Sequence, residues 1–210
     1  MNKIHQSIVA LVLVGLVGCG YEPRAVGDTN PARVEEMKQS LRDLWVGHIF
    51  WGRHVVSNIA TNDLEERDAA EKEVVNNTKQ IAHTMGPFYG EVASEKFYRL
   101  LDSNIDAVRE YSEATVADNK QQQDAALAHM AANADEIADF LSHLNPYLQK
   151  DTVRALIATH GAHHVLQIKQ YKAKDYAPLG ATWPMMRQHI YVIADTFTTA
   201  LAKQFPDKFS

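Results

Sequence analysis

Apolar side chains that recur every three or four residues are the feature that most constrains the fold of this chain. The clearest run begins at Val34 and ends at Ile59. An α-helix turns once in about 3.6 residues, so this spacing places the apolar side chains on one face of a helix of about seven turns. Asn30 and Pro31 precede the run as a helix N-cap and a first helical residue would. The predicted inward positions are Val34, Met37, Leu41, Leu44, His48, Trp51, Val55 and Ile59.

The same period returns in later segments, which turn-forming residues separate. We predict a loop over residues 175–184, where Pro178 and Gly180 lie, and no segment alternates as a strand would. The sequence therefore predicts an all-α, up-and-down bundle of four long helices plus one or two shorter ones. The later helices are expected over residues 64–85, 91–117, 120–144, 151–172 and 185–205.

The beginning of the chain has the pattern of an export signal. Lys3 precedes an unbroken apolar run over residues 8–14, which is too short to span a bilayer as a helix. Leu16-Val17-Gly18-Cys19 then resembles the lipobox of bacterial lipoproteins, whose cysteine is lipidated with acyl chains such as palmitate. The resemblance implies a signal peptide over residues 1–18, a flexible tether over 19–30 and a helical domain over 31–210.

Lipidation of Cys19 would hold the protein on a lipid bilayer. Cys19 is the only cysteine in the chain, and an ordinary signal peptide with a free thiol is the alternative. In lipoproteins of Gram-negative bacteria, a residue other than Asp after the cysteine implies the outer membrane, and Gly20 fits that pattern. We therefore expect a cell-envelope protein that faces the periplasm if the source is Gram-negative.

The net charge excludes one class of partner. The formal charge is −5 at pH 7, and the basic residues form no cluster. Nucleic acid and anionic lipid surfaces attract basic patches, so we expect the domain to bind neither.

Polar residues interrupt the inward faces of several predicted helices. His160 and His164 are four residues apart, the spacing at which two imidazoles on one helix face can share an ion. Helix bundles build metal sites from such facing side chains, so we predict that His48, His160 and His189, with His164, hold a transition metal such as zinc, copper or iron, or a small polar ligand. Further candidates for ligand binding or a polar network are Asn77, Tyr89, Asn104, Asn133, Arg53 and Trp51.

The same residues admit a purely structural interpretation. Buried histidines and asparagines can hydrogen-bond to one another and fix the helix register, because an unpaired buried polar group costs about 1 to 3 kcal/mol. Asp135 and Glu136 fall beside or opposite the inward stripe, so a two-metal carboxylate site is not expected. Arg53 is expected to pair with an acid such as Asp135 or Asp195.

Enzymatic signatures are absent from the sequence. No serine lies in a Gly-x-Ser-x-Gly turn, no glycine-rich loop could cradle a phosphate, and the only cysteine lies in the tether. We therefore name no catalytic residue.

Several short motifs, taken in order and spacing, resemble a family of small bacterial helical proteins of unassigned function. The resemblance implies the helical fold and selects positions, but it implies no activity. This chain departs from the family pattern at four positions. It has Asn104 where relatives tend to have His, Gln80 where Asp is usual, and Gln167 where Glu is usual. Pro184 lies near a position that Asp often holds. The motifs are Leu44-Trp45 with His48, Trp51 and Arg53; Asn77; Pro87-Phe88-Tyr89-Gly90; Asn133 to Leu141; Asn145-Pro146; His160; His189; Ala194-Asp195; and Gln204-Phe205-Pro206 with Lys208-Phe209.

Together these observations predict a membrane-anchored envelope lipoprotein whose bundle core holds a metal ion or a small polar ligand. The alternative is a structural or interaction lipoprotein, with an envelope protein as its partner and an inert, hydrogen-bonded core. An enzyme of unknown class is the third interpretation.

Overall fold

The structure is a computed structural model that describes residues 29–210. The predicted signal peptide, Cys19 and most of the predicted tether lie outside these residues. Within them the chain is helical throughout and contains no strand, which confirms the predicted all-α bundle, with six long helices. The elements are α1 (Pro31–Thr61), α2 (Leu64–His83), α3 (Gly86–Tyr89), α4 (Glu91–Val116), α5 (Lys120–Leu144), α6 (Lys150–Ala173), α7 (Tyr176–Gln204) and the 3₁₀ turn η1 (Pro206–Lys208).

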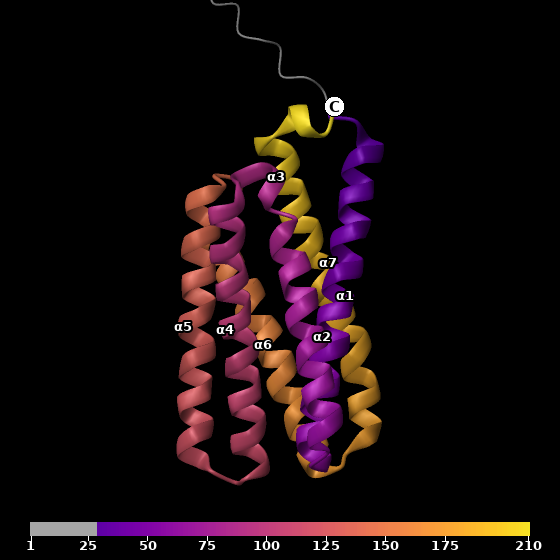
Figure 1. The fold of residues 1–210 in the computed structure, drawn as a ribbon, viewed down its shortest axis with the longest axis vertical. Coiled ribbons are helices and arrows are strands. Elements are labelled where there is room, and N and C mark those ends of the chain that lie inside the picture. Colours follow the sequence, from indigo (N-terminus) through magenta and orange to yellow (C-terminus); the bar gives the residue numbers. More distant parts are fainter. Residues whose placement is uncertain (1–28) are drawn as a thin grey trace, which may run out of the picture.

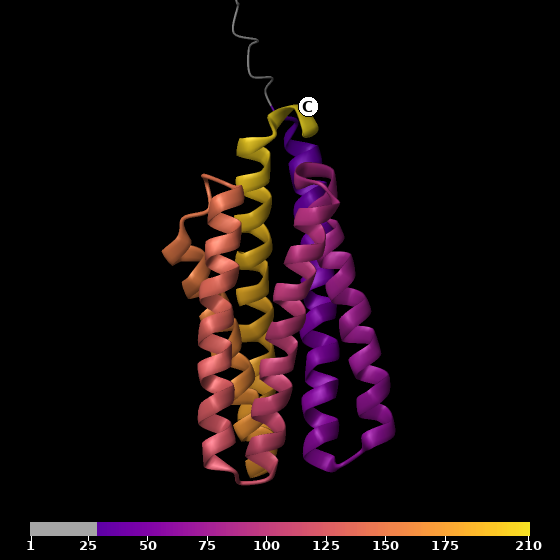
Figure 2. The same ribbon diagram turned by 60° about the vertical axis from the view of Figure 1, so that its left-hand side comes forward.

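The long helices run alternately up and down the long axis of the molecule (Figure 1). Each long helix contacts the next one along the chain, and α7 returns to contact α1, so that the six close into a ring (Figure 2). Helices α1, α4 and α6 also contact one another across the bundle. Side chains that these three helices direct inward therefore meet at its centre.

Side-chain caps fix the beginnings of three helices. The Asn30 carboxamide oxygen accepts from the backbone N–H of Ala32 at 3.0 Å, and Pro31 opens α1, as the sequence predicts. Asp63 and Asn119 cap α2 and α5 in the same way. The Asn30 N–H also donates to the Phe209 carbonyl at 2.6 Å, so the described chain begins and ends at the same end of the bundle.

Helix α7 begins well before its predicted start, so the predicted loop over residues 175–184 is wrong. Pro178 lies in the first turn, where a backbone N–H has no intrahelical partner to lose. Pro184 lies inside the helix and removes one hydrogen bond. Burial of neighbouring side chains offsets that loss. The buried residues of this segment are Leu179, Thr182 and Met186.

The buried face of α1 is turned relative to the predicted face. Trp45 and Ile49 are fully buried, whereas Leu44 and Trp51 are only partly buried. Both sets of residues are apolar, so the helical period alone allows either to face inward. Packing decides between them, because the indole of Trp45 meets the ring of Phe197 on α7, with 6.5 Å between the ring centroids. The predicted inward positions Leu41, His48, Val55 and Ile59 are buried.

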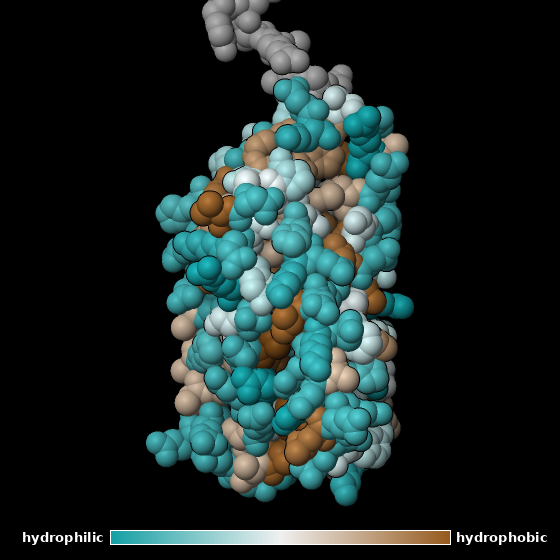
Figure 3. Space-filling model, viewed as in Figure 1, coloured by the Kyte–Doolittle hydropathy of each residue, from teal (hydrophilic) through white to brown (hydrophobic). Residues whose placement is uncertain are grey.

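The face of the bundle drawn in Figure 3 is mainly hydrophilic. Figure 3 shows apolar side chains gathered in the furrow between helices, with polar side chains on the ridges. Within residues 29–210, no helix is long and apolar enough to cross a membrane.

We predict opposite effects for two glycine substitutions in helices. A Cβ at Gly47 would lie 2.8 Å from the Asn77 carboxamide nitrogen, which donates to the Leu44 carbonyl at 3.0 Å. At Gly180 an added Cβ meets nothing within 4 Å. Gly180→Ala should raise the free energy of unfolding by up to about 1 kcal/mol through helix propensity. Gly47→Ala should be at least about 1 kcal/mol less stable than Gly180→Ala, because the Asn77 bond is disrupted.

Urea denaturation of the two variants measures this difference. Equal stability would mean that α1 and α2 do not approach closely at Gly47.

Candidate functional site

Three histidines meet at the centre of the bundle. His48 comes from α1, and His160 and His164 come from successive turns of α6. The ring centroids of His48 and His160 are 5.8 Å apart, and those of His160 and His164 are 4.7 Å apart. Each side chain is at most 4% exposed. We call these three residues the imidazole cluster.

The hydrogen bonds of the cluster are incomplete. The Thr78 hydroxyl donates to the Val74 carbonyl at 2.7 Å and lies 3.3 Å from His48 Nδ1. A hydroxyl has one proton to donate, so Thr78 Oγ1 must accept from His48, whose proton is therefore on Nδ1. Nε2 of His160 and Nδ1 of His164 are buried and have no partner within residues 29–210. Each such group costs about 1 to 3 kcal/mol.

Burial keeps the cluster neutral. Desolvation lowers the pKa of His48 to about 4 and is the main cause that lowers the pKa of His164 to about 3. The pKa of His160 is also well below the usual value, first through burial and then through its histidine neighbours. No carboxylate contributes to these shifts. At neutral pH the three rings are thus uncharged donors and acceptors.

A small cavity adjoins the cluster. His48 and His164 line it together with Gly52 and Asn104, and its volume is about 20 Å³, enough for one water molecule. A Cβ at Gly52 would lie 3.5 Å from His164 Cε1, an ordinary contact distance. Arg109 also lines the cavity, but its guanidinium pairs with Asp106 at 2.8 Å. Among the residues that line the cavity, His164 therefore supplies the buried polar atom without a partner, its Nδ1.

The predicted asparagines form structural bonds between helices. The Asn104 carboxamide on α4 donates to Asn133 Oδ1 on α5 at 2.9 Å, and Asn133 Nδ2 donates to the Leu100 carbonyl at 2.8 Å. Asn77 ties α2 to α1 through the Leu44 carbonyl, as described above. Of these three residues, Asn104 alone also lines the cavity beside the imidazole cluster.

The predicted metal set is not assembled. His189 Nε2 donates to the Leu156 carbonyl at 2.8 Å, and its ring packs against His163 rather than the cluster, with 5.2 Å between the centroids. Among residues 29–210, no group of three or more His, Cys, Asp or Glu side chains is placed to hold a metal ion. The physical reason is the rotation of α7, which turns His189 toward the outer edge of α6.

Tyr89 belongs to a separate network at the end of the bundle where α1 begins. Its hydroxyl donates to Gln204 Oε1 at 2.6 Å and accepts from Asn145 Nδ2 at 2.9 Å. Gln204 Nε2 in turn donates to the Leu144 carbonyl at 2.9 Å. The network joins α3, the end of α5 and the end of α7.

Arg53 and Trp51 also lie outside the imidazole cluster. Arg53 Nε donates to the Tyr171 hydroxyl at 3.0 Å, so the predicted pairing with Asp135 or Asp195 is wrong. Asp195 instead accepts two bonds from Arg42, at 2.8 and 2.6 Å. Arg42 lies about three turns nearer the start of α1 than Arg53 and pairs with α7 there. Trp51 packs against the aliphatic cluster that includes Val55 and Ile59.

The candidate site residues chosen from the sequence leave out Thr78 and Trp45, which contact His48, and Gln167, about one turn beyond His164 on α6. Thr78 anchors His48, Trp45 packs edge-on against it with centroids 5.5 Å apart, and Gln167 is fully buried with Oε1 unpartnered within the described chain. A polar residue at an apolar position of the period is the signal that could have found Thr78 and Gln167. No residue type marks Trp45 apart from the other tryptophans.

The fold and the cluster define a class: a single all-α bundle with a neutral, partly unsatisfied polar core. Comparison of the chain with protein-family models, with curated protein sequences and with solved structures gives no match.

Isosteric substitutions should separate the two kinds of buried polar residue. His164→Leu replaces a ring that has an unpaired nitrogen with an apolar side chain of similar size. The free energy of unfolding should therefore stay unchanged or rise at neutral pH. Asn133→Leu leaves the Asn104 donor unpaired and should lower the free energy of unfolding by about 1 to 3 kcal/mol. Urea denaturation at about pH 7.5 measures both. Equal losses would mean that His164 has partners that the structure does not give it.

The cluster should also make stability depend on pH. The unfolded chain takes up protons near the ordinary histidine pKa of about 6.5, whereas the folded cluster does not. The free energy of unfolding should therefore fall as pH drops below about 6.5, by about 1.4 kcal/mol per pH unit for each buried histidine. His164→Leu should reduce this slope by one histidine's share between about pH 6 and 4.5, and His83→Leu, at an exposed position, should not. Identical slopes in all three proteins would contradict the neutral core.

Proposed function

We propose that this protein is a membrane-anchored envelope lipoprotein whose helical domain binds a small, uncharged polar molecule at the imidazole cluster. The anchor in this proposal is acylated Cys19, within the motif that resembles a lipobox. The binding site is the cluster with its adjoining cavity. The two parts are independent, since one concerns location and the other concerns the ligand.

One observation carries the binding proposal: two buried imidazole nitrogens without partners lie in one core. The nitrogens are His160 Nε2 and His164 Nδ1. Replacing the rings with apolar side chains would remove their cost, so a core kept only for stability has no need of them. A ligand that donates to or accepts from these nitrogens would offset the cost when it binds.

The surroundings of the cluster favour an uncharged ligand. The three imidazoles are neutral, and burial of a charge without a counter-charge is far more costly than burial of a dipole. Asn104, which lines the cavity, and Gln167, about one turn beyond His164 on α6, are uncharged as well. The ligand must also be small, because the free room beside His48 and His164 is about 20 Å³. A molecule of more than a few heavy atoms would have to displace side chains.

The second candidate function is a structural or interaction protein with an inert core. The completed bonds between Asn104, Asn133 and the Leu100 carbonyl favour it, because they show that this bundle does use buried polar groups to join helices. In that case an envelope protein would be the partner, and the imidazoles would be remnants without a ligand.

Native mass spectrometry of the protein purified from its own membranes tests the binding proposal. We expect the native mass to exceed the denatured mass by one discrete ligand. His164→Leu should lose that excess mass, and the matched variant His83→Leu should keep it. Equal native and denatured masses for the unaltered protein would contradict the proposal and favour the inert core.

A further inference from the structure

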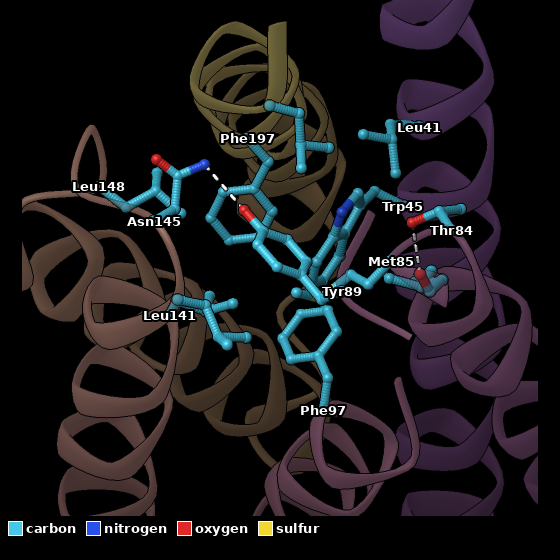
Figure 4. A pocket seen from close by; sticks show the side chains of 13 residues that line it. Leu41, Trp45, Thr84, Met85, Tyr89, Phe97, Leu141, Asn145, Leu148 and Phe197 are labelled. Carbon is cyan, nitrogen blue, oxygen red and sulfur yellow. Dashed lines mark hydrogen bonds between the residues drawn. The ribbon is translucent and has the colours of Figure 1, made fainter. Parts of the chain in front are cut away.

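A second cavity lies at the end of the bundle where α1 begins, on the far side of Trp45 from the imidazole cluster. Its walls are almost entirely apolar and come from several helices that are distant in sequence (Figure 4). The room in it that a molecule can occupy is about 20 Å³, so any ligand larger than a water requires side chains to move. The main apolar walls are Leu41, Met85, Phe97, Leu141 and Phe197.

Trp45 gives this cavity one unpaired polar group. Its side chain is 1% exposed and lines the cavity, and its indole Nε1 has no hydrogen-bond partner within residues 29–210. Figure 4 shows the indole standing in the wall between Leu41 and Tyr89, with no bond drawn to its nitrogen. An indole N–H can only donate, and a buried tryptophan normally finds an acceptor.

The other polar groups of the wall already have partners. The Thr84 hydroxyl donates to the Ile81 carbonyl at 2.7 Å. The Tyr89 hydroxyl is bonded to Asn145 and Gln204, and Asn145 Oδ1 accepts from the backbone N–H of Tyr147 at 2.9 Å. Trp45 Nε1 is therefore the one buried polar side-chain atom of this wall that has no hydrogen-bond partner within residues 29–210.

We propose that this cavity binds a small, mainly apolar molecule with one acceptor oxygen, such as a ketone, an ester or an ether. The oxygen accepts from Trp45 Nε1, and the apolar body lies against Phe97, Leu141 and Phe197. This site is distinct from the imidazole cluster, whose rings lie 5.5 Å (His48) and 6.3 Å (His160) from Trp45, centroid to centroid. The two sites also differ in chemistry, because Trp45 Nε1 can only donate a hydrogen bond, whereas the cluster offers acceptors as well as donors.

The wall must move to admit such a ligand. Without it, the room wide enough for a molecule is about 20 Å³, which holds one water. Met85 is flexible and polarizable, the kind of side chain that adjusts to a new neighbour. Helix α3 has only four residues and no fully buried one, and Tyr89 at its end covers the cavity. Displacing Met85 and Tyr89 opens the cavity, and moving Tyr89 breaks its hydrogen bonds to Asn145 and Gln204.

The test uses two probes of the same shape, cyclohexanone and methylenecyclohexane, added to the full-length protein. Proton–nitrogen NMR spectra resolve the indole N–H signals of the three tryptophans, and Trp45→Phe assigns one of them to Trp45. We expect cyclohexanone to shift the Trp45 signal in a saturable way. Methylenecyclohexane lacks the acceptor, so on binding it should not cause the downfield shift that a hydrogen bond gives the Trp45 indole N–H.

Trp45→Phe keeps an aromatic wall and removes the donor. It should weaken cyclohexanone binding by about tenfold and leave methylenecyclohexane binding unchanged. The matched control, Trp51→Phe on the partly exposed face of α1, should change neither. If Trp45→Phe does not fold, the contrast between the two probes on the unaltered protein still decides the question.

Three results would overturn the proposal: no saturable binding of cyclohexanone, the same Trp45 shift with both probes, or a cyclohexanone shift confined to Trp51 and Trp183. None of these depends on the ligand of the imidazole cluster, because His164→Leu leaves Trp45 in place. Failure of one site therefore does not imply failure of the other.

Discussion

The desolvation of three imidazoles at the contact between α1 and α6 is the constraint on which the rest of the structure depends. His48 and His160 can be this deeply buried only because α4 packs against both of their helices and the other helices close the ring around them. Burial in turn removes their charge, since an unpaired cation there would be far more costly than a neutral ring. Because the three imidazoles are neutral, the core favours an uncharged ligand.

The buried polar residues of this bundle are of two kinds, those with completed hydrogen bonds and those with unpaired atoms. Asn104 and Asn133 are hydrogen-bonded to each other and to backbone, and such bonds fix how helices align. The imidazoles of His160 and His164 each keep one unpaired nitrogen, and His164 lines a cavity. Stability alone favours the first arrangement and disfavours the second. This contrast is why we assign ligand binding to the histidines and a structural role to the asparagines.

Trp45 separates two chemically different spaces. One of its neighbours is the neutral imidazole cluster, and the other is the apolar cavity beneath Tyr89. A ligand in the apolar cavity would contact this indole ring, whereas Trp45 does not line the cavity beside His48 and His164.

The helical period was sufficient to predict the all-α class, the cap at Asn30 and the burial of His48, His160 and His164. It could not predict which row of α1 faces inward, because Leu44 and Trp51 are as apolar as Trp45 and Ile49. It failed for His189, whose direction depends on how α7 rotates against α6, a matter of packing between helices. The start of α7 was missed because prolines usually end helices, whereas Pro178 falls in a first turn and buried neighbours hold Pro184 in place. Lipidation of Cys19 stays a prediction from its motif.

The protonation state of the imidazole cluster is the most direct test of this account. Long-range proton–nitrogen NMR spectra at about pH 5.5, one unit below the ordinary histidine pKa, distinguish neutral from charged rings. The account predicts that His48, His160 and His164 are neutral there, with the His48 proton on Nδ1. A charged ring at any of the three positions would contradict it, because that core offers no carboxylate to compensate a cation.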